Sequence, residues 1–514
     1  MRYKIMGFAM MALMFFCSFA ATALDQDNSQ NRIHQHRSYQ LPETECTCDG
    51  MELCTHLPLI RIDTAGQYIP GEIIRDLENS EAVLGYTTTQ SGASEILVTI
   101  ETVETEGEWH HASDPADQSS QALFRIRGNS SRNFDKKSYR IKLVEDETAA
   151  SGNDLPLLGM NPDNDWALHG PFLDKTLLRN YMWMNISAEV MGYAPNVRFC
   201  ELILNGEYRG VYVLMETIKE SEYRVDLSDY EEGSTATSYL LQLDAVGTPA
   251  DQNSADVYLE NYTWYTHQTE FSEVSRTGFS ILYPQKEYLS EDVVGYIQRD
   301  VSRIERGLYS SDMVTGTYDY QSELDVDSFV DYYILQEFLA VNDVFSRSTY
   351  LYRDIRGTLH MGPVWDYNNV LNNFFIDLSR RGFLLANRGW YGRLMTSEDF
   401  VERVIGRYRQ LRQGVLSDEY LTNYIDEVIA FLGPAIERND EVWGYSYNPT
   451  LLERRQRREH DKGETLEEAN PRSYEDAIGR MEGYMLSRAE WLDEHIDTLY
   501  QYCHPSKNAS QWLG

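Results

Sequence analysis

The sequence predicts an α+β protein in which a strand-rich first half is followed by a helix-rich second half. Short runs of β-branched and aromatic residues, bounded by Gly, Asn, Asp or Ser, recur up to about residue 215. Beyond residue 290 the apolar residues change to helical spacing. A chain of 514 residues is too long for one small core, so two lobes or domains are expected.

The first half is predicted to contain six strands and one helix. The strands are expected at 59–62, 96–100, 123–127, 139–143, 201–204 and 211–215. The helix lies near Asp174 to Met191 and is entered through a turn at Pro171. Strand 139–143 alternates, so its aromatic and aliphatic residues should face the core while Arg140 and Lys142 share the other face.

The second half is predicted to be mainly helical. A helix over 293–308 follows a plausible cap at Ser290, and further helices are expected at 327–341, 398–432 and 474–501. Two strands interrupt them, Thr349–Tyr352 and Thr358–Met361, joined by a turn at Arg356 and Gly357. The charged stretch 453–468 is typical of a solvated loop.

Residues 1–24 have the composition of a secretory signal. Arg2 and Lys4 precede an apolar run from Ile5 to Phe19, and a small-residue cleavage region follows at 20–23. No later stretch approaches 18 apolar residues, so the mature chain is expected to be exported, secreted or periplasmic, without a transmembrane span. We expect residues 25–56 to form a linker and 504–514 a tail.

The formal net charge is −36. Such a charge argues against non-specific nucleic-acid binding, which depends on Lys and Arg displacing counterions. It is compatible with a basic partner or simply with solubility. A hydrophobic content of 42% indicates a folded chain rather than a disordered one.

Five cysteines remain after the signal: Cys46, Cys48, Cys54, Cys200 and Cys503. An exported setting permits disulfides, and the close trio could include a local one, although pairing cannot be read from sequence. A zinc site is the alternative, but no Cys or His pair has finger spacing. The adjacent His110 and His111 should point to opposite faces of a strand, which disfavours joint metal binding.

Two aspartates in the second half are candidates for catalysis. Asp343 ends a predicted helix, and Asp366 follows a strand and a turn further along, so both carboxylates can reach one cleft. Phosphoryl transfer uses one carboxylate to orient the attacking hydroxyl and another to hold a metal. Ser348 stands where a kinase catalytic loop places a metal-binding Asn. Taken alone, these residues are better explained as helix caps and turn formers.

A Gly/Ser turn in the first half could approach phosphate. Arg127-Gly128-Asn129-Ser130-Ser131 connects strands 123–127 and 139–143, and such turns present backbone N–H groups. Lys137 and Lys142 follow it. Neither a Walker A pattern nor G-x-G-x-x-G occurs, and a solvated surface hairpin is the simpler interpretation of this segment by itself.

Together these segments resemble the CotH family of spore-coat kinases, in order and spacing over roughly residues 57–375. The matching segments are 127–131 with 137–143, then 174–180, 204–216, 239–244, 333–343, 348–352 and 362–367. The resemblance implies a bilobal atypical protein kinase fold, with an N-terminal lobe at 57–219 and a helical C-terminal lobe at 220–503. It also implies transfer of the ATP γ-phosphate to Ser or Thr of a protein substrate, with Mg²⁺ or Mn²⁺. We expect that substrate to be Ser-rich or basic.

The resemblance assigns roles to the two aspartates and to the hinge. Asp343 matches the catalytic Asp, and Asp366 matches the metal-binding Asp. Residues 213–216, ending at Glu216, look like the hinge that would bind adenine. An acid on the first-half helix should pair with the phosphate-facing Lys, and both Asp174 and Glu189 fit that description.

The phosphate-binding residues implied by the resemblance come from the Gly/Ser turn and the strand after it. They are Arg127, Gly128, Ser130 and Ser131, with Lys142 preferred as the phosphate-facing lysine and Lys137 as the alternative.

The chain departs from the family pattern beside the metal position. The family usually continues Trp-Asp-aromatic-Asp, whereas this chain has Asn368 as the last of the four. An amide still offers an oxygen to a metal but supplies one negative charge fewer. A catalytically weak or inactive kinase-like binding module of an envelope or extracellular assembly is therefore the alternative. A metal-dependent hydrolase using the same carboxylates is a third.

Overall fold

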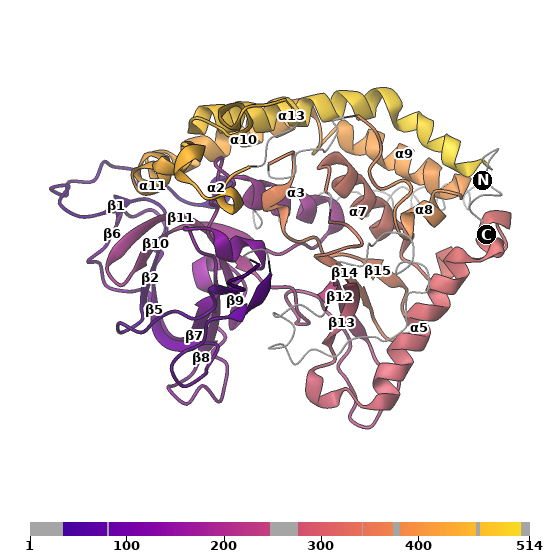
Figure 1. The fold of residues 1–514 in the computed structure, drawn as a ribbon, viewed down its shortest axis with the longest axis horizontal. Helices are drawn as coiled ribbons and strands as arrows, with labels where there is room; N and C mark the ends of the chain where they lie inside the picture. Colours follow the sequence, from indigo (N-terminus) through magenta and orange to yellow (C-terminus); the bar gives the residue numbers. More distant parts are fainter. Residues whose placement is uncertain are drawn as a thin grey trace, which may run out of the picture.

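The structure is a computed structural model that describes residues 34–79, 82–246, 276–341, 343–373, 381–458 and 463–504. The expected signal and all but the first residue of the expected tail lie outside these residues. Within them the chain is a mixed α+β protein, as the sequence predicts (Figure 1).

The first half folds into a closed seven-stranded barrel. Its strands run in the order β10-β11-β9-β8-β7-β5-β2, with β10 and β2 parallel and every other neighbouring pair antiparallel. Their bounds are β2 (Leu59–Asp63), β5 (Ile96–Val103), β7 (Gln118–Ile126), β8 (Tyr139–Val144), β9 (Asp165–His169), β10 (Val197–Leu204) and β11 (Glu207–Glu216). Closure pairs both edges of every barrel strand.

The six predicted strands all occur, and the alternation in β8 is confirmed. Tyr139, Ile141 and Leu143 lie in the barrel core, while Arg140 and Lys142 are half-buried on the other face. β9 was not predicted from the sequence, because its five residues mix Asp and His with apolar residues and show no clear alternation.

Two short ribbons and a helix precede or flank the barrel. β1 (Cys54–Thr55) pairs with β6 (His110–His111), and β3 (Ile73–Arg75) pairs with β4 (Val83–Tyr86). Helix α2 (Gln35–Ser38) lies inside the expected linker 25–56. The buried Gln35 side chain accepts from the Phe199 N–H at 2.7 Å and donates to its carbonyl at 3.2 Å, so this part of the expected linker belongs to the core.

The second half contains a four-stranded sheet of order β13-β12-β14-β15. These strands are β12 (Tyr239–Val246), β13 (Arg276–Tyr283), β14 (Thr349–Arg353) and β15 (Leu359–Met361). The α-helices of this half are α5 (Glu291–Tyr309), α6 (Ser311–Thr315), α7 (Val326–Phe338), α8 (Tyr391–Leu394), α9 (Glu398–Arg412), α10 (Asp418–Leu432), α11 (Ala435–Trp443), α12 (Leu466–Ala469) and α13 (Tyr474–His495). Helix α3 (Arg179–Met191) belongs to the first half, between β9 and β10. None of the described helices is both long and apolar enough to cross a bilayer.

Helix ends follow local capping chemistry. The predicted cap at Ser290 is confirmed, since its hydroxyl accepts from the Val293 N–H at 3.3 Å. The single helix expected over 398–432 is two helices, because the chain turns after α9 and Ser417 caps α10. The helix expected over 474–501 changes to 3₁₀ geometry at Ile496.

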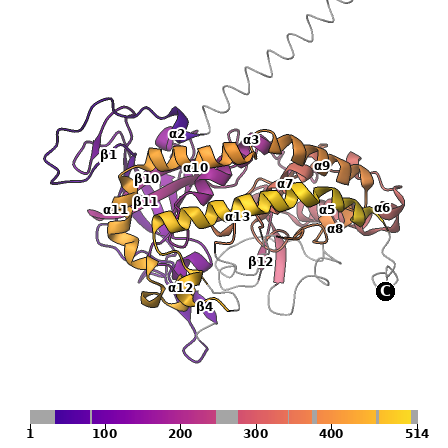
Figure 2. The ribbon, with the colours of Figure 1, turned by 90° about the horizontal axis from the view of Figure 1, so that it is seen from above.

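The C-terminal helices join the two halves. In Figures 1 and 2, α13 runs from beside the barrel to the far end of the helical part, and α11 lies against the barrel. Arg438 of α11 lies 2.8 Å from the buried Glu201 of β10. The buried Lys136 donates to Asn439 of α11 at 2.7 Å. Hydrogen bonds and ion pairs that are shielded from water are stronger than exposed ones, so these two contacts fix α11 on the barrel.

A buried ion pair fixes the end of α7. Arg488 of α13 lies 2.5 Å from Glu337, and both side chains are almost fully buried. Glu337 also accepts from the N–H groups of Leu384 at 2.7 Å and Leu385 at 2.9 Å. The pair therefore ties α7, α13 and the segment before α8 together, six residues before Asp343.

We expect Arg488→Met to lower the thermal midpoint strongly, because it leaves the Glu337 carboxylate buried without its cation, at a cost of about 3–5 kcal/mol. Arg409→Met is the matched control, since Arg409 pairs with Asp497 at the surface and both side chains are more than half exposed. Calorimetry on both variants should show a shift only for Arg488→Met. Equal shifts in the two variants would contradict the conclusion that the buried Arg488–Glu337 pair supports the fold.

Candidate functional site

Two loops meet where α7 and β15 end. The loop after α7 carries Asp343, and the loop after β15 carries Asp366; the Leu371 N–H donates to the Leu339 carbonyl at 3.1 Å and joins them. Left-handed backbone concentrates here, at Ala340, Phe345, Ser348, Asp366, Leu371 and Asn372, with φ between 49° and 65°. Such conformations cost energy in non-glycine residues and cluster at functional sites.

The start of α3 holds the Asp366 loop in place. Asn180 accepts from the Tyr367 N–H at 2.9 Å, and Arg179 donates to the Val370 carbonyl at 3.0 Å. The buried Asp174 in turn lies 2.5 Å from Arg179. Asp174 therefore orients Arg179 and not a lysine of the barrel.

Glu189, the other acid considered for that pairing, lies near the opposite end of α3. Its carboxylate is 2.7 Å from His34 and accepts from the Tyr420 hydroxyl at 2.6 Å. These contacts hold α2 and α10 against α3.

Asp343 lies close enough to Asp366 for its charge to act on the Asp366 carboxyl. The Asp366 side chain is exposed to solvent, although many protein atoms lie around it. Burial and then the Asp343 carboxylate raise the pKa of Asp366 to about 6, while Arg127 acts in the opposite direction. Burial also raises the pKa of Asp343, against the charges of Arg347 and Arg388. Two carboxylates close enough to raise a pKa form a site that favours a cation.

Arg127 brings the barrel to this site. Its guanidinium lies over the Trp365 ring, 5.3 Å from the centroid, and its charge stabilises the Asp366 carboxylate. Gly128 follows with φ of 102°, and a Cβ there would overlap the Ser131 hydroxyl, so the turn requires glycine. Gly128 and Ser130 are exposed and Ser131 is half-buried beside Arg127.

The two candidate lysines do not join Asp366. Lys137 donates to the Arg132 carbonyl at 2.8 Å and lies 4.0 Å from Glu72. Lys142 is half-buried on the outer face of β8, with Asp165 of β9 as its backbone neighbour. Among the described residues, Arg127 is the cation that stabilises the Asp366 carboxylate.

Glu216 is buried at the end of β11. Its carboxylate accepts from the Asn196 N–H at 2.9 Å, and burial raises its pKa. Residues 213–216 pair with β9, and 213–215 also pair with β10. This leaves the backbone of the expected hinge largely occupied, so any base-binding groups would come from the residues after it.

Three groups near the site were missed by sequence reasoning. Asp244 of β12 raises the pKa values of both Asp366 and Tyr350, and Tyr350 of β14 lies on the strand beside it. His169, at the end of β9, has its pKa lowered to about 3 by burial, with Arg127 and Lys136 acting in the same direction. Asp244 ends a segment that resembles the family, which was the signal available for it.

The donor atoms beside Asp366 fit a divalent cation. The side-chain oxygens of Asn368 and Asn369 are buried with no hydrogen-bond partner among the described residues. Ser348 directly precedes β14. The next residue, Thr349, pairs with Leu243 of β12, so Asp244 lies close to Ser348. No acidic trio with all ligand atoms within 4.8 Å occurs here in the described ranges. A metal would therefore be held by Asp366 with neutral oxygens, which hard cations accept.

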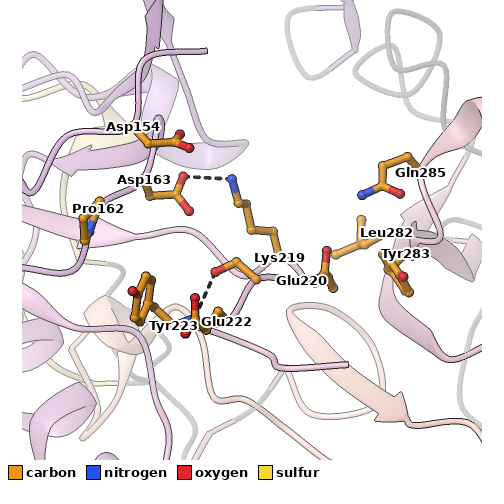
Figure 3. Close-up of a pocket in the computed structure, with 11 residues that line it drawn as sticks. Asp154, Pro162, Asp163, Lys219, Glu220, Glu222, Tyr223, Leu282, Tyr283 and Gln285 are labelled. Carbon is orange, nitrogen blue, oxygen red and sulfur yellow. Dashed lines mark hydrogen bonds and ion pairs between the residues drawn. The ribbon is translucent and has the colours of Figure 1, made fainter. Parts of the chain in front are cut away.

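A separate hollow of about 490 Å³ lies after β11. Figure 3 shows its lining, with Lys219 pointing to Asp163, which lies 2.8 Å away, and Leu282 to Gln285 across the opening. Asp154, Glu220 and Glu222 add further acids to the wall. Such a lining repels a polyphosphate, so phosphate groups are better matched by Arg127 and the turn after it.

Comparison with known proteins identifies the family of this chain. The family model for CotH kinase protein matches residues 124–492, well over half of the chain. The chain belongs to the CotH family. The matched region includes every candidate site residue from Arg127 to Asn368. The chain is also similar to inner spore coat protein H of Bacillus subtilis (strain 168), with 21% identity over 327 residues, which cover 58% of this chain and 79% of that protein.

Asp366→Asn is expected to stabilise the metal-free protein at pH 8. The raised pKa of Asp366 means that its charged form destabilises the fold above about pH 6, and this penalty fades as pH falls through 6 toward the unfolded value near 4. Because solvent reaches the carboxyl, we expect a rise in thermal midpoint of only about 1–2 °C at pH 8, shrinking at lower pH. Asp497→Asn, at an exposed site, should show no such trend. A lower thermal midpoint for Asp366→Asn at pH 8 would contradict the claim that the charged Asp366 carboxylate destabilises the fold.

Proposed function

We propose that this chain is an exported, metal-dependent protein Ser/Thr kinase with a bilobal kinase-like fold. The observation that carries the proposal is the meeting of Asp343, Asp366 and Arg127 at one solvent-accessible site, between the barrel and the helical half. Membership of a family described as CotH kinase protein supports it. ATP is the phosphoryl donor, and Mg²⁺ or Mn²⁺ is the cation.

Different residues bind the metal and the phosphates. Asp366 and the side-chain oxygen of Asn368 hold the metal, with the Ser348 hydroxyl as a further neutral ligand. Bound metal–ATP supplies the phosphoryl group and the neutralising charge. Arg127, held over Trp365, and the turn at Gly128, Ser130 and Ser131 bind the phosphates.

Asp343 orients the substrate hydroxyl and accepts its hydrogen bond. Burial raises the pKa of Asp343, which makes it a better proton acceptor near neutral pH than an exposed aspartate. The protein substrate is proposed to be Ser-rich or basic, because the chain's own charge of −36 attracts cationic partners.

A kinase-like binding module is the second candidate function. The observations that favour it are the neutral Asn368 and the lack of an acidic trio at Asp366 among the described residues. Such a module would keep the fold and the loop anchors at Arg179 and Asn180 without turnover. It is distinguished from the kinase by nucleotide binding.

Magnesium or manganese with ATP is expected to raise the thermal midpoint. A ligand that binds only the folded state stabilises it by about 2.7 kcal/mol at a concentration one hundred times its dissociation constant. Differential scanning fluorimetry with ATP, with metal and with both should show the largest shift for the combination. Transfer of labelled γ-phosphate to a Ser-rich protein should accompany it.

The matched variants for this experiment are Asp366→Ala and Asp497→Ala. Asp366→Ala should abolish both the shift and the transfer, whereas Asp497→Ala, at a remote exposed site, should retain both. A flat response to every nucleotide and metal combination would refute the kinase and favour the binding module.

Asn368→Asp is expected to tighten the metal site. A second carboxylate beside Asp366 adds attraction for a divalent cation, and we expect the metal concentration for half-maximal stabilisation by ATP to fall by about tenfold. Asn448→Asp, at a remote turn where Asn448 accepts from the Thr450 N–H at 3.1 Å, controls for added charge. An unchanged metal requirement in Asn368→Asp would remove Asn368 from the metal site.

A further inference from the structure

Three cysteines and one histidine converge beside the barrel, away from the proposed kinase site. Ligand atoms of Cys46, Cys48, Cys54 and His111 all lie within 4.8 Å of one another. In the β1–β6 ribbon Cys54 is the direct partner of His111, and the loop before β1 returns Cys46 to 3.3 Å from the His111 Nε2. Figure 1 shows this ribbon beside the barrel.

The spacing of these atoms is that of a tetrahedral metal site. With Zn–S near 2.3 Å and Zn–N near 2.0 Å, a tetrahedral centre places two sulfurs about 3.8 Å apart and a sulfur and a nitrogen about 3.5 Å apart. The observed Cys46–His111 separation of 3.3 Å is already close to this, and a spread of 4.8 Å at most closes with small side-chain rotations.

His111 is oriented as a metal-binding histidine is. Its Nδ1 lies 3.3 Å from the Asp114 carboxylate, which also accepts the His111 N–H at 2.7 Å, so Nε2 is left facing the sulfurs. A carboxylate on the distal ring nitrogen fixes the tautomer and strengthens the ligand. His110 differs, because both of its ring nitrogens contact backbone carbonyls, those of Leu57 and Thr105.

The loops that carry the ligands are attached to the barrel. Arg61 of β2 donates to the Ala112 carbonyl at 2.9 Å and to the Asp114 carbonyl at 2.6 Å. Ser113 donates to Glu52 through its N–H at 3.1 Å and its hydroxyl at 2.9 Å. Each strand of the β1–β6 ribbon has only two residues, so the ribbon needs further connections to be stable.

A disulfide accounts for less of this arrangement. One bridge would use two of the three thiols and leave the third beside an imidazole with no function. The remaining described cysteines cannot complete a second bridge here, because Cys200 is buried in the barrel and Cys503 donates to the Met395 carbonyl near the C-terminus. A single bound cation would account for the convergence of all four side chains, which are of the types that bind zinc.

We propose that Cys46, Cys48, Cys54 and His111 bind one Zn²⁺. Four protein ligands fill the coordination shell, so the site is structural and has no open position for a reaction. It fastens segment 46–56 to the β6 turn and, through Arg61, to the barrel. The ligands lack the spacing of a zinc finger, which is why their positions in the sequence do not indicate zinc; the histidine comes from a strand more than fifty residues further along the chain.

Metal analysis of the full chain tests the site. The protein is purified through an affinity tag without histidines, and zinc is measured by inductively coupled plasma mass spectrometry. We expect about one zinc per chain in the parent protein and in Cys503→Ser and His504→Asn, the matched controls outside the site. Cys48→Ser and His111→Asn should lose most of it.

Cobalt substitution and thiol chemistry give an independent readout. Reduced, metal-stripped protein titrated with Co²⁺ should develop thiolate-to-cobalt charge-transfer and tetrahedral d–d bands, which zinc then removes. These bands should be absent in Cys48→Ser and weakened in His111→Asn.

Three results would overturn the proposal. They are a disulfide among Cys46, Cys48 and Cys54 in unreduced protein by peptide mass spectrometry, zinc that persists in both site variants, and no cobalt bands after reduction. Nucleotide binding at Asp366 should be unaffected by the site variants, which separates this inference from the proposed kinase activity.

Discussion

The buried contact between Asp174 and Arg179 is the interaction on which the rest of the candidate site depends. Arg179 is charged and almost fully enclosed, and an enclosed guanidinium is tolerated only when an anion and carbonyls satisfy it. Asp174 provides the anion and Val370 a carbonyl. Through this contact the first turn of α3 determines where the loop after β15 runs, and therefore where the Asp366 carboxylate points.

The charged groups around Asp366 come from both halves of the molecule. The helical half contributes Asp244, Asp343 and Asp366 to one region, and burial, followed by repulsion from Asp343 and Asp244, raises the pKa of Asp366. The stabilising cation, Arg127, comes from the barrel. The contacts of α11 with Glu201 and Lys136 hold the barrel where Arg127 can reach Trp365, so C-terminal residues support a site to which they contribute no ligand.

Much of the fold could be predicted from local patterns. All six expected barrel strands occur, and the Ser290 cap and the hairpin of β14 and β15 are confirmed, because alternation, caps and turns depend on neighbouring residues. Closure of the barrel and the burial of Gln35 could not be predicted, since they depend on contacts between distant segments.

The candidate site was predicted in part. The sequence identified Asp343, Asp366 and Arg127, which the structure brings together, and the CotH resemblance is confirmed by the family match. Lys137 and Lys142 lie elsewhere because the barrel places them away from the Asp366 loop. Asp244 was missed because one acid within a strand has no local signature; its position near Asp366 depends on the pairing of β12 with β14.

The left-handed backbone at Asp366 limits how this position can change during evolution. With φ of 65° and ψ of 57°, the site tolerates Asp, Asn or Gly at little cost, whereas most other side chains add strain. A lineage that no longer needs the carboxylate would therefore drift first to Asn or Gly and keep its fold. In such descendants the backbone of the loop would keep its course, and only the carboxylate at position 366 would be missing.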